Sequence, residues 1–160
     1  MLGRNERGWH IVGGLFIALI GLIITVTAPT HGGQYTGLCV LLFGSYVSAP
    51  LTVAWLSGNT PEPGMRALVL GVNGFGNFAG VIGSQLYRPA YAPSYRVPFF
   101  ATLGFIAMAF LGYISYRYTL AMVNVRKRNK IASITTRDIE IERTNDLRYS
   151  DKKWTFQYGL

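Results

Sequence analysis

"LVLGVNGFGNFAGVIGSQLY", residues 68–87, is an uncharged stretch rich in glycine and in large apolar side chains. It lies in a 21-residue interval, 67–87, that contains no Lys, Arg, Asp or Glu. At about 1.5 Å per residue, a helix of this length crosses the ~30 Å hydrocarbon core of a bilayer. A soluble helix of the same length would turn a charged face to water, and this stretch has none to offer. The stretch therefore predicts a membrane-spanning helix.

The same pattern recurs on both sides of this stretch. Residues 8–61 and 97–116 also lack Lys, Arg, Asp and Glu. The first of these intervals is too long for one crossing, and its Pro- and Gly-containing residues 29–34 predict a turn. We therefore expect an all-α membrane protein with four transmembrane helices. The expected helices cover residues 9–28, 36–57, 66–87 and 97–120, between an amino-terminal segment, 1–8, and a tail, 121–160.

Both ends of the chain are expected to lie outside the bilayer. The apolar run 11–28 follows Arg4 and Arg7 as in a signal peptide, but it lacks a clean cleavage site, so we expect a retained helix. The tail mixes charges of both signs with few large apolar residues. Such a composition predicts a largely disordered segment, with one short helix near residues 136–143.

Lysine and arginine are unevenly divided between the two sides of the expected membrane region. The side opposite the chain ends carries Arg88 and Arg96. The side with both chain ends carries Arg4, Arg7, Arg66, Arg117, Arg126, Lys127, Arg128 and Lys130. Cytoplasmic loops are enriched in basic residues, so we expect both termini to be cytoplasmic. The cluster 126–130 predicts contact with anionic headgroups of the lipid bilayer, and we expect no nucleic-acid partner.

Residues 74–79, Gly-Phe-Gly-Asn-Phe-Ala, match the G-x-G-x-x-G/A pattern of a dinucleotide-binding turn, and their surroundings resemble the phosphate loop of glyceraldehyde-3-phosphate dehydrogenases. A working turn of this kind needs an acidic residue about 20 positions further on to hold the ribose. After Asn77, no Asp or Glu occurs before Asp138. No second strand–helix unit follows either, so we reject this interpretation and expect no cofactor.

A membrane helix explains the same residues better. Gly76, Gly80 and Gly83 place small residues near one helix face, which allows another helix backbone to approach closely. Asn73 and Asn77 are four residues apart and share a face in a regular helix. A side-chain amide that faced lipid would be unsatisfied, so these two must face another helix or a watery cavity. Both roles, an interhelical hydrogen-bond clamp and a substrate-cavity lining, remain open at this point.

No group of residues indicates catalysis. The sequence has no paired carboxylates within the expected helices, no G-x-S-x-G and no His-x-x-x-His. Its one cysteine, Cys39, excludes an internal disulfide and a cysteine-based metal cluster. We therefore expect neither an enzyme nor a metal site.

Several motifs follow one another along the chain. The first, "WLSGNTPEPGMRAL", covers residues 55–68 and contains Trp55, Asn59 and Arg66. It resembles the link between helices ten and eleven of fungal major facilitator transporters of the allantoate permease family. "GNFAGVIGSQLY", residues 76–87, resembles helix eleven. "GRNERGWH" (3–10), "YAPSYRVPF" (91–99), "NVRKRNK" (124–130) and "FQYGL" (156–160) resemble the entry to helix nine, the loop after helix eleven and two parts of the tail.

The resemblance implies that the chain supplies helices nine to twelve, a part of the carboxy-terminal half of a twelve-helix transporter. It also implies a substrate cavity between two halves, with Asn73, Asn77, Tyr46 and Gln85 facing it, and proton-coupled uptake of small organic anions of the carboxylate or ureide class at the plasma membrane. Alternating access needs two units that rock about a central site, so this part alone is expected to be inactive. Its partners would be the missing transporter helices or, without them, further copies of the chain.

Two other classes of membrane protein fit four spans. A free-standing scaffold or regulatory protein is the main alternative. A small multidrug-type antiporter needs a carboxylate within the membrane for its protons, and no expected span contains one.

Overall fold

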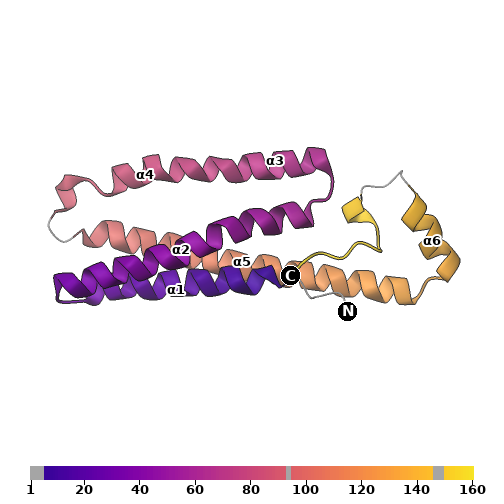
Figure 1. The fold of residues 1–160 in the computed structure, drawn as a ribbon, viewed down its shortest axis with the longest axis horizontal. Helices are drawn as coiled ribbons and strands as arrows, with labels where there is room; N and C mark the ends of the chain where they lie inside the picture. The colour runs from indigo at the N-terminus through magenta and orange to yellow at the C-terminus, as the bar shows by residue number, and fades with distance from the viewer. Residues whose placement is uncertain (1–5, 93–94, 146–149) are drawn as a thin grey trace.

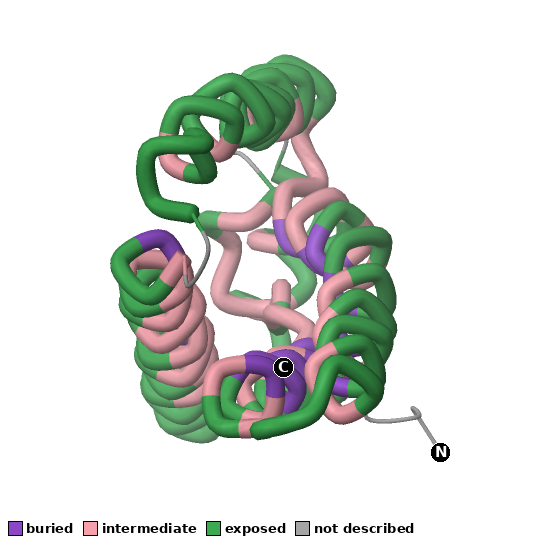
Figure 2. The backbone as a smooth tube through the Cα atoms, turned by 90° about the vertical axis from the view of Figure 1, so that its left-hand side faces the viewer, coloured by how far each residue is buried: buried purple, intermediate pink, exposed green. Residues whose placement is uncertain are grey.

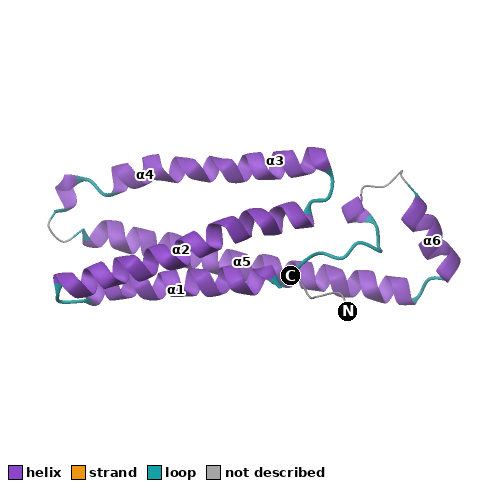
Figure 3. Ribbon diagram, in the orientation of Figure 1, coloured by secondary structure: helices purple, strands orange, loops and turns teal. Residues whose placement is uncertain are grey.

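The structure, a computed structural model, describes residues 6–92, 95–145 and 150–160. These residues form helices joined by loops, with no strand among them (Figures 1 and 3). Four helical spans are long and apolar enough to cross a membrane: Arg7–Thr27, His31–Asn59, Pro63–Leu86 and Arg96–Ala132. The all-α fold with four transmembrane helices that the sequence predicts is confirmed.

Helices α1 (Arg7–Thr27) and α2 (His31–Asn59) form an antiparallel hairpin in which glycines let the two backbones touch (Figure 1). A Cβ atom added to Gly21 would lie 2.8 Å from the carbonyl oxygen of Gly37. One added to Gly44 would lie 2.5 Å from the backbone nitrogen of Ala18. Side chains do not tolerate contacts this short, so a larger residue at either position would push the helices apart. Close packing through small residues is what holds helices together in lipid.

Buried hydroxyl groups in this hairpin are satisfied by backbone carbonyls. Thr25 Oγ1 donates to Gly21 O at 2.9 Å. Ser48 Oγ of α2 lies 3.0 Å from Gly44 O and 3.3 Å from Ile11 O of α1, so its proton is available to either helix. Because a hydroxyl without a partner would be costly in an apolar setting, these bonds let polar residues sit at the contact between the helices.

Helix α5 (Arg96–Ala132) packs along α1 and extends past it (Figure 1). Ile11 of α1, Trp55 of α2 and Leu120 of α5 form the buried apolar cluster where the three helices meet. The expected span, 97–120, is shorter than the observed helix of 37 residues. A helix of that length is about 55 Å long, which exceeds the ~30 Å hydrocarbon core, so one end projects out of the membrane region.

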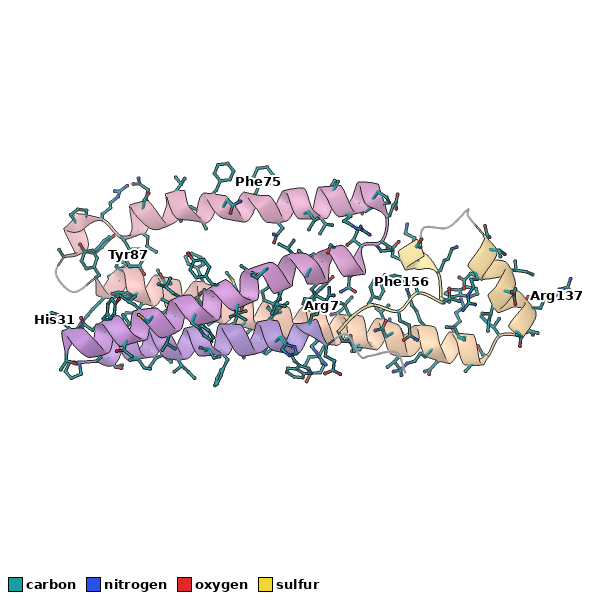
Figure 4. The ribbon with its side chains drawn as sticks, viewed as in Figure 1. Arg7, His31, Phe75, Tyr87, Arg137 and Phe156 are labelled. Carbon is teal, nitrogen blue, oxygen red and sulfur yellow. The ribbon has the colours of Figure 1, made fainter. Side chains whose placement is uncertain are left out.

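The third span stands apart from the other three. It consists of α3 (Pro63–Gly74), a 3-10 turn η1 (Phe75–Phe78) and α4 (Ala79–Leu86). None of its apolar window is buried within the structure, and it is almost wholly exposed in Figure 2. Phe75 points away from the other helices, whereas Tyr87, next to the end of α4, points toward α5 (Figure 4). The Tyr87 hydroxyl lies 2.8 Å from Thr102 Oγ1, and a short turn, η2 (Pro89–Tyr91), follows.

The tail expected at 121–160 contains helical segments among its described residues. α5 continues to Ala132, and the short helix expected near 136–143 is α6 (Thr136–Thr144). A single turn, η3 (Ser150–Lys152), follows within the described residues. Residues 153–160 then run back beside α5 and end near the start of α1 (Figure 1). The reason for this order lies in specific contacts at the end of the helices, described next.

Candidate functional site

The four residues expected to line a substrate cavity do not meet in the structure. Asn73 of α3 and Asn77 of η1 are exposed, and their side chains form no hydrogen bond within the described residues. Tyr46 of α2 is 75% exposed. Gln85 of α4 is exposed and accepts a hydrogen bond from Arg88 Nε at 3.0 Å. Their role in substrate binding therefore stays a prediction.

The 3-10 turn alters the geometry expected for the two amides. A 3-10 helix turns about 120° per residue and an α-helix about 100°. Since η1 spans Phe75–Phe78, Asn77 is rotated further from Asn73 than in a regular α-helix. The two side chains therefore share a face only approximately. A 3-10 stretch within a longer helix often marks a hinge or a strained segment.

The glycines expected to pack against another helix have no neighbour in the described chain. Gly76, Gly80 and Gly83 have no heavy atom within 4 Å of an added Cβ. The packing glycines of the structure are instead on α1 and α2, as described for Gly21 and Gly44. We did not predict them, although small residues at four-residue spacing in α2 carry the same signal. Packing at Gly76, Gly80 and Gly83 stays a prediction that needs another protein surface.

The motif residues Trp55, Asn59 and Arg66 make contacts in two different places. Arg66 holds the turn between α2 and α3: its Nε donates to Thr60 O at 2.9 Å and its Nη2 to Pro61 O at 3.0 Å. These carbonyls follow the end of α2 and would otherwise lack a partner in the chain. Trp55 and Asn59 both point to the tail instead.

Two asparagine side chains bind consecutive peptide groups of the tail. Asn59 Nδ2 donates to Gly159 O at 3.1 Å, and Gly159 N donates to Asn59 Oδ1 at 2.7 Å. Asn124 of α5 makes the same pair with Tyr158: its Nδ2 donates to the carbonyl at 2.8 Å, and its Oδ1 accepts from the amide at 2.9 Å. Both asparagines are only 6% exposed. Loss of either side chain would leave peptide groups unsatisfied, at a cost of ~1–3 kcal/mol.

Trp55 and Lys127 complete this arrangement, and we call Trp55, Asn59, Asn124 and Lys127 the tail site. Trp55 Nε1 donates to Gly159 O at 2.7 Å, so this carbonyl accepts from two side chains of α2. The ammonium group of Lys127 donates to Asp151 O at 2.6 Å and to Phe156 O at 3.2 Å. It also lies 4.4 Å from the ring centroid of Tyr158. A cation near an aromatic face adds ~0.5–2 kcal/mol to such a contact.

Aromatic and aliphatic side chains form the apolar floor of the tail site. The Trp55 ring packs edge-on against Tyr116, with centroids 5.0 Å apart, and stacks against Tyr113 at 6.2 Å. Tyr158 and Leu160 of the tail pack against the buried cluster that contains Trp55. The tail is thus held by polar contacts along its backbone and by apolar contacts of its side chains.

A cavity of about 590 Å³ lies beside the docked tail and is bordered by Glu6, Arg7 and Arg128 as well as by tail residues. Arg7 Nη1 donates to Ala54 O at 2.8 Å, which fixes one wall of the cavity to α2. Arg7 and Phe156 are near each other in Figure 4, at the end of the helices where the tail enters. Arg128 is exposed.

The basic cluster 126–130 is divided between two faces of α5. We expected the whole cluster to meet lipid headgroups, but Lys127 contacts the tail and the Lys130 ammonium lies 3.8 Å from the Trp154 ring centroid. Arg126 and Arg128 are exposed. The tail thus screens part of the charge that the sequence assigns to the bilayer.

The Tyr158 hydroxyl is part of the same network. It donates to Asp151 O at 3.1 Å. Partial burial, followed by the nearby Asp151 carboxylate, raises the pKa of Tyr158 above its ordinary value. The neutral phenol is therefore the form that suits the docked tail.

A periodic signal in the tail could have predicted its docking. Trp154, Phe156, Tyr158 and Leu160 are large apolar residues at every second position. This alternation is typical of an extended segment with one buried face. The mixed charges upstream outweigh this alternation in the composition of the whole tail.

The fold defines the class of protein: four apolar helices that make an integral membrane protein. Its relatives are fungal transporters. The chain is 31% identical over 155 residues to the high-affinity nicotinic acid transporter of Saccharomyces cerevisiae, covering 95% of this chain and 28% of that protein. It is 32% identical over 117 residues to the major facilitator-type transporter hxnP of Emericella nidulans, covering 68% and 24% of the two chains.

An uncharacterized transporter of Schizosaccharomyces pombe is 25% identical over 127 residues, or 79% of this chain and 26% of the relative. The chain thus spans about a quarter of the length of these three relatives. No family model matches the sequence, and no solved structure matches the fold.

Proposed function

We propose that this chain is part of a major facilitator transporter of the allantoate permease family, with both termini in the cytoplasm and the spans in the plasma membrane. The transporter takes up small organic anions together with protons, and the chain alone does not transport. The proposal rests on the exposure of the third span. Its glycines and two amides have no partner within the described chain, as expected for a helix whose neighbours belong to the rest of a larger protein.

The substrate class follows from the kind of side chains on that span and from one relative. Asn73, Asn77 and Gln85 carry amide donors, and Tyr46 of α2 carries a hydroxyl, all of which can bind a carboxylate. Nicotinic acid, named in the yeast relative, is a small carboxylate. We therefore assign these four residues to the binding of a carboxylate or ureide.

Proton coupling requires a titratable group within the membrane. The spans α1, α2 and α3–α4 contain no Asp or Glu between Gly8 and Pro61 or between Arg66 and Arg88, and α5 contains none. The two histidines, His10 and His31, lie in the first turns of α1 and α2, so we assign the residue that carries the proton to helices outside this chain.

A chimera tests the proposal. This chain replaces the matching segment of the yeast nicotinic acid transporter, and uptake of labelled nicotinic acid is measured in vesicles with and without a pH gradient. We expect uptake that depends on the gradient, and none from this chain alone in the same vesicles. A chimera that inserts and folds but takes up no substrate would contradict the family assignment, and activity of the chain alone would contradict the need for missing helices.

Asn77→Leu in the chimera tests the substrate site. We expect uptake to fall at least about tenfold, because a buried carboxylate would lose a hydrogen-bond donor. Ser115→Ala is the control, because Ser115 on α5 donates only to Leu111 O of its own helix. Equal uptake by Asn77→Leu and by the unchanged chimera would remove Asn77 from the site.

A free-standing four-helix scaffold is the second candidate, favoured by the tail, which closes the described chain on itself at one end. The two functions predict different oligomers. A scaffold that is complete in itself would purify in detergent as a uniform species, whereas a transporter part with an uncovered third span would associate heterogeneously or be degraded in cells.

A further inference from the structure

The tail connects two helices that are otherwise joined mainly through a third. α1 packs against both α2 and α5 along its length. At the end of the bundle, Asn59 of α2 and Asn124 of α5 bind neighbouring peptide groups of one extended segment. Direct contact between α2 and α5 occurs near the same place, where Thr52 Oγ1 lies 2.9 Å from the Tyr113 hydroxyl.

We propose that the tail site is a peptide-binding groove and that its occupant, residues 154–160, is a detachable strap that ties α2 to α5. The groove takes an extended segment of the pattern aromatic–x–aromatic–Gly–Leu. Residues 156–160 have this pattern, and no other described stretch of the chain has it.

The contacts explain both the affinity and the selectivity of the groove. The two asparagine pairs bind backbone groups, so they accept any extended segment. Selectivity comes from side chains: Tyr158 lies over the Lys127 ammonium, Phe156 packs edge-on against Tyr158 with centroids 5.2 Å apart, and Leu160 fills the apolar floor. Gln157 is exposed and contributes no described contact.

The strap can detach because the contacts that hold its last residues are made mainly with side chains of other elements. Residues 156–160 form no helix or strand, and the hydrogen bonds that hold Tyr158 and Gly159 go to side chains of α2 and α5. Release of the segment therefore unfolds no regular element. It exposes Asn59 and Asn124 to water, which can replace the lost peptide partners, and it removes the link between the two helices.

Hydrogen exchange on the full chain in lipid nanodiscs tests docking and release. We expect the amides of Tyr158 and Gly159 to exchange more slowly than in an unfolded peptide, but faster than the amides of the α1–α2 contact, because the strap opens locally. Asn124→Leu should raise exchange at Tyr158 about tenfold or more, since it removes both bonds of one pair. Asn129→Leu, an exposed asparagine on the same helix, is the matched control.

Unprotected amides at Tyr158 and Gly159 in the wild type would overturn docking. Exchange as slow as that of the α1–α2 contact would overturn detachment. Unchanged exchange in Asn124→Leu would overturn the assignment of the groove. Protection of the α1–α2 amides reports folding of each variant, so a misfolded variant is recognised and Asn59→Leu is then used instead.

A distance measurement tests the tie between the helices. Spin labels are placed at Gly58→Cys on α2 and Met122→Cys on α5, both exposed, with Cys39→Ser to remove the native thiol. We expect a narrow distance distribution in this background and a broader one when Asn124→Leu is added. If hydrogen exchange shows that Asn124→Leu releases the tail and the two distance distributions are still equal, the strap does not tie α2 to α5.

Discussion

Asn59 and Asn124 lie on different helices, yet each makes two hydrogen bonds to a tail residue, and those tail residues are neighbours in the chain. The tail backbone therefore offers each asparagine side chain one N–H donor and one C=O acceptor, as neighbouring strands do in a sheet. Neither side chain would be satisfied by its own helix, and both are almost fully buried. The pair explains why Asn59, which the sequence resemblance selects, is needed at the end of α2.

The contact between α1 and α2 should be sensitive to one methyl group. We expect Gly21→Ala to destabilise the chain by about 1–3 kcal/mol, because the added Cβ would overpack against Gly37 of α2. Gly13→Ala on the same helix is the control, since an added Cβ there meets no atom within 4 Å. Thermal unfolding in detergent measures both. Equal melting temperatures for the two variants would contradict the packing of the hairpin.

Gly80 should behave differently in the isolated chain and in a complete transporter. Nothing lies within 4 Å of an added Cβ at Gly80, so Gly80→Leu should change the stability of the isolated chain by less than about 0.5 kcal/mol. In the chimera with the yeast transporter, the same change should abolish uptake, because a partner helix would be pushed away. The two assays are thermal unfolding and labelled uptake. Full uptake by the Gly80→Leu chimera would show that this face has no partner.

Lys127 should hold the tail through both its charge and its hydrogen bonds. We expect Lys127→Met to speed chymotrypsin cleavage after Phe156 and Tyr158 several-fold, because the ammonium contacts Asp151 O, Phe156 O and the Tyr158 ring. Arg128→Met removes a neighbouring exposed charge and should leave cleavage unchanged. Cleavage is followed by mass spectrometry. Faster cleavage in both variants would indicate a general effect of charge and not the specific contacts of Lys127.

The docked tail should loosen at alkaline pH. The pKa of Tyr158 is raised by burial and by Asp151, so its contribution to docking is present below the ordinary tyrosine pKa of about 10 and is lost as the pH rises through the raised value. Lys127 also loses its charge at high pH. Comparison with Tyr158→Phe separates the contribution of the Tyr158 hydroxyl from that of Lys127. A spin label at Gln157→Cys, with Cys39→Ser, measures tail mobility. If both proteins loosen equally, the phenol contributes nothing.

The sequence predicts the membrane helices well because their signal is local. An uncharged interval of sufficient length is enough to place the third span, and its observed bounds, Pro63–Leu86, lie close to the expected 66–87. The far end of α5 was missed because charge ends an apolar interval but does not end a helix. Residues 121–132 contain four basic side chains and are still helical, and they project beyond the other helices.

The tail site could not be derived from the sequence in the same way. Its bonds join residues between 24 and 104 positions apart, and no local pattern pairs an asparagine with a distant peptide group. The resemblance placed Trp55 and Asn59 in a family motif, but we did not predict their contact with the tail. The alternation in residues 154–160 is a signal of an extended segment that we did not use, and only the fold brings the two parts of the site together.

The close packing around Leu160 affects where a tag can be fused when the protein is expressed. Its carbonyl carbon would lie 3.2 Å from a Cβ added to Gly8, and the same added atom would meet Arg117 at 3.2 Å, so the space around it is nearly full. An affinity handle or fluorescent reporter fused after Leu160 would have to leave through this crowded corner and would displace the residues before it.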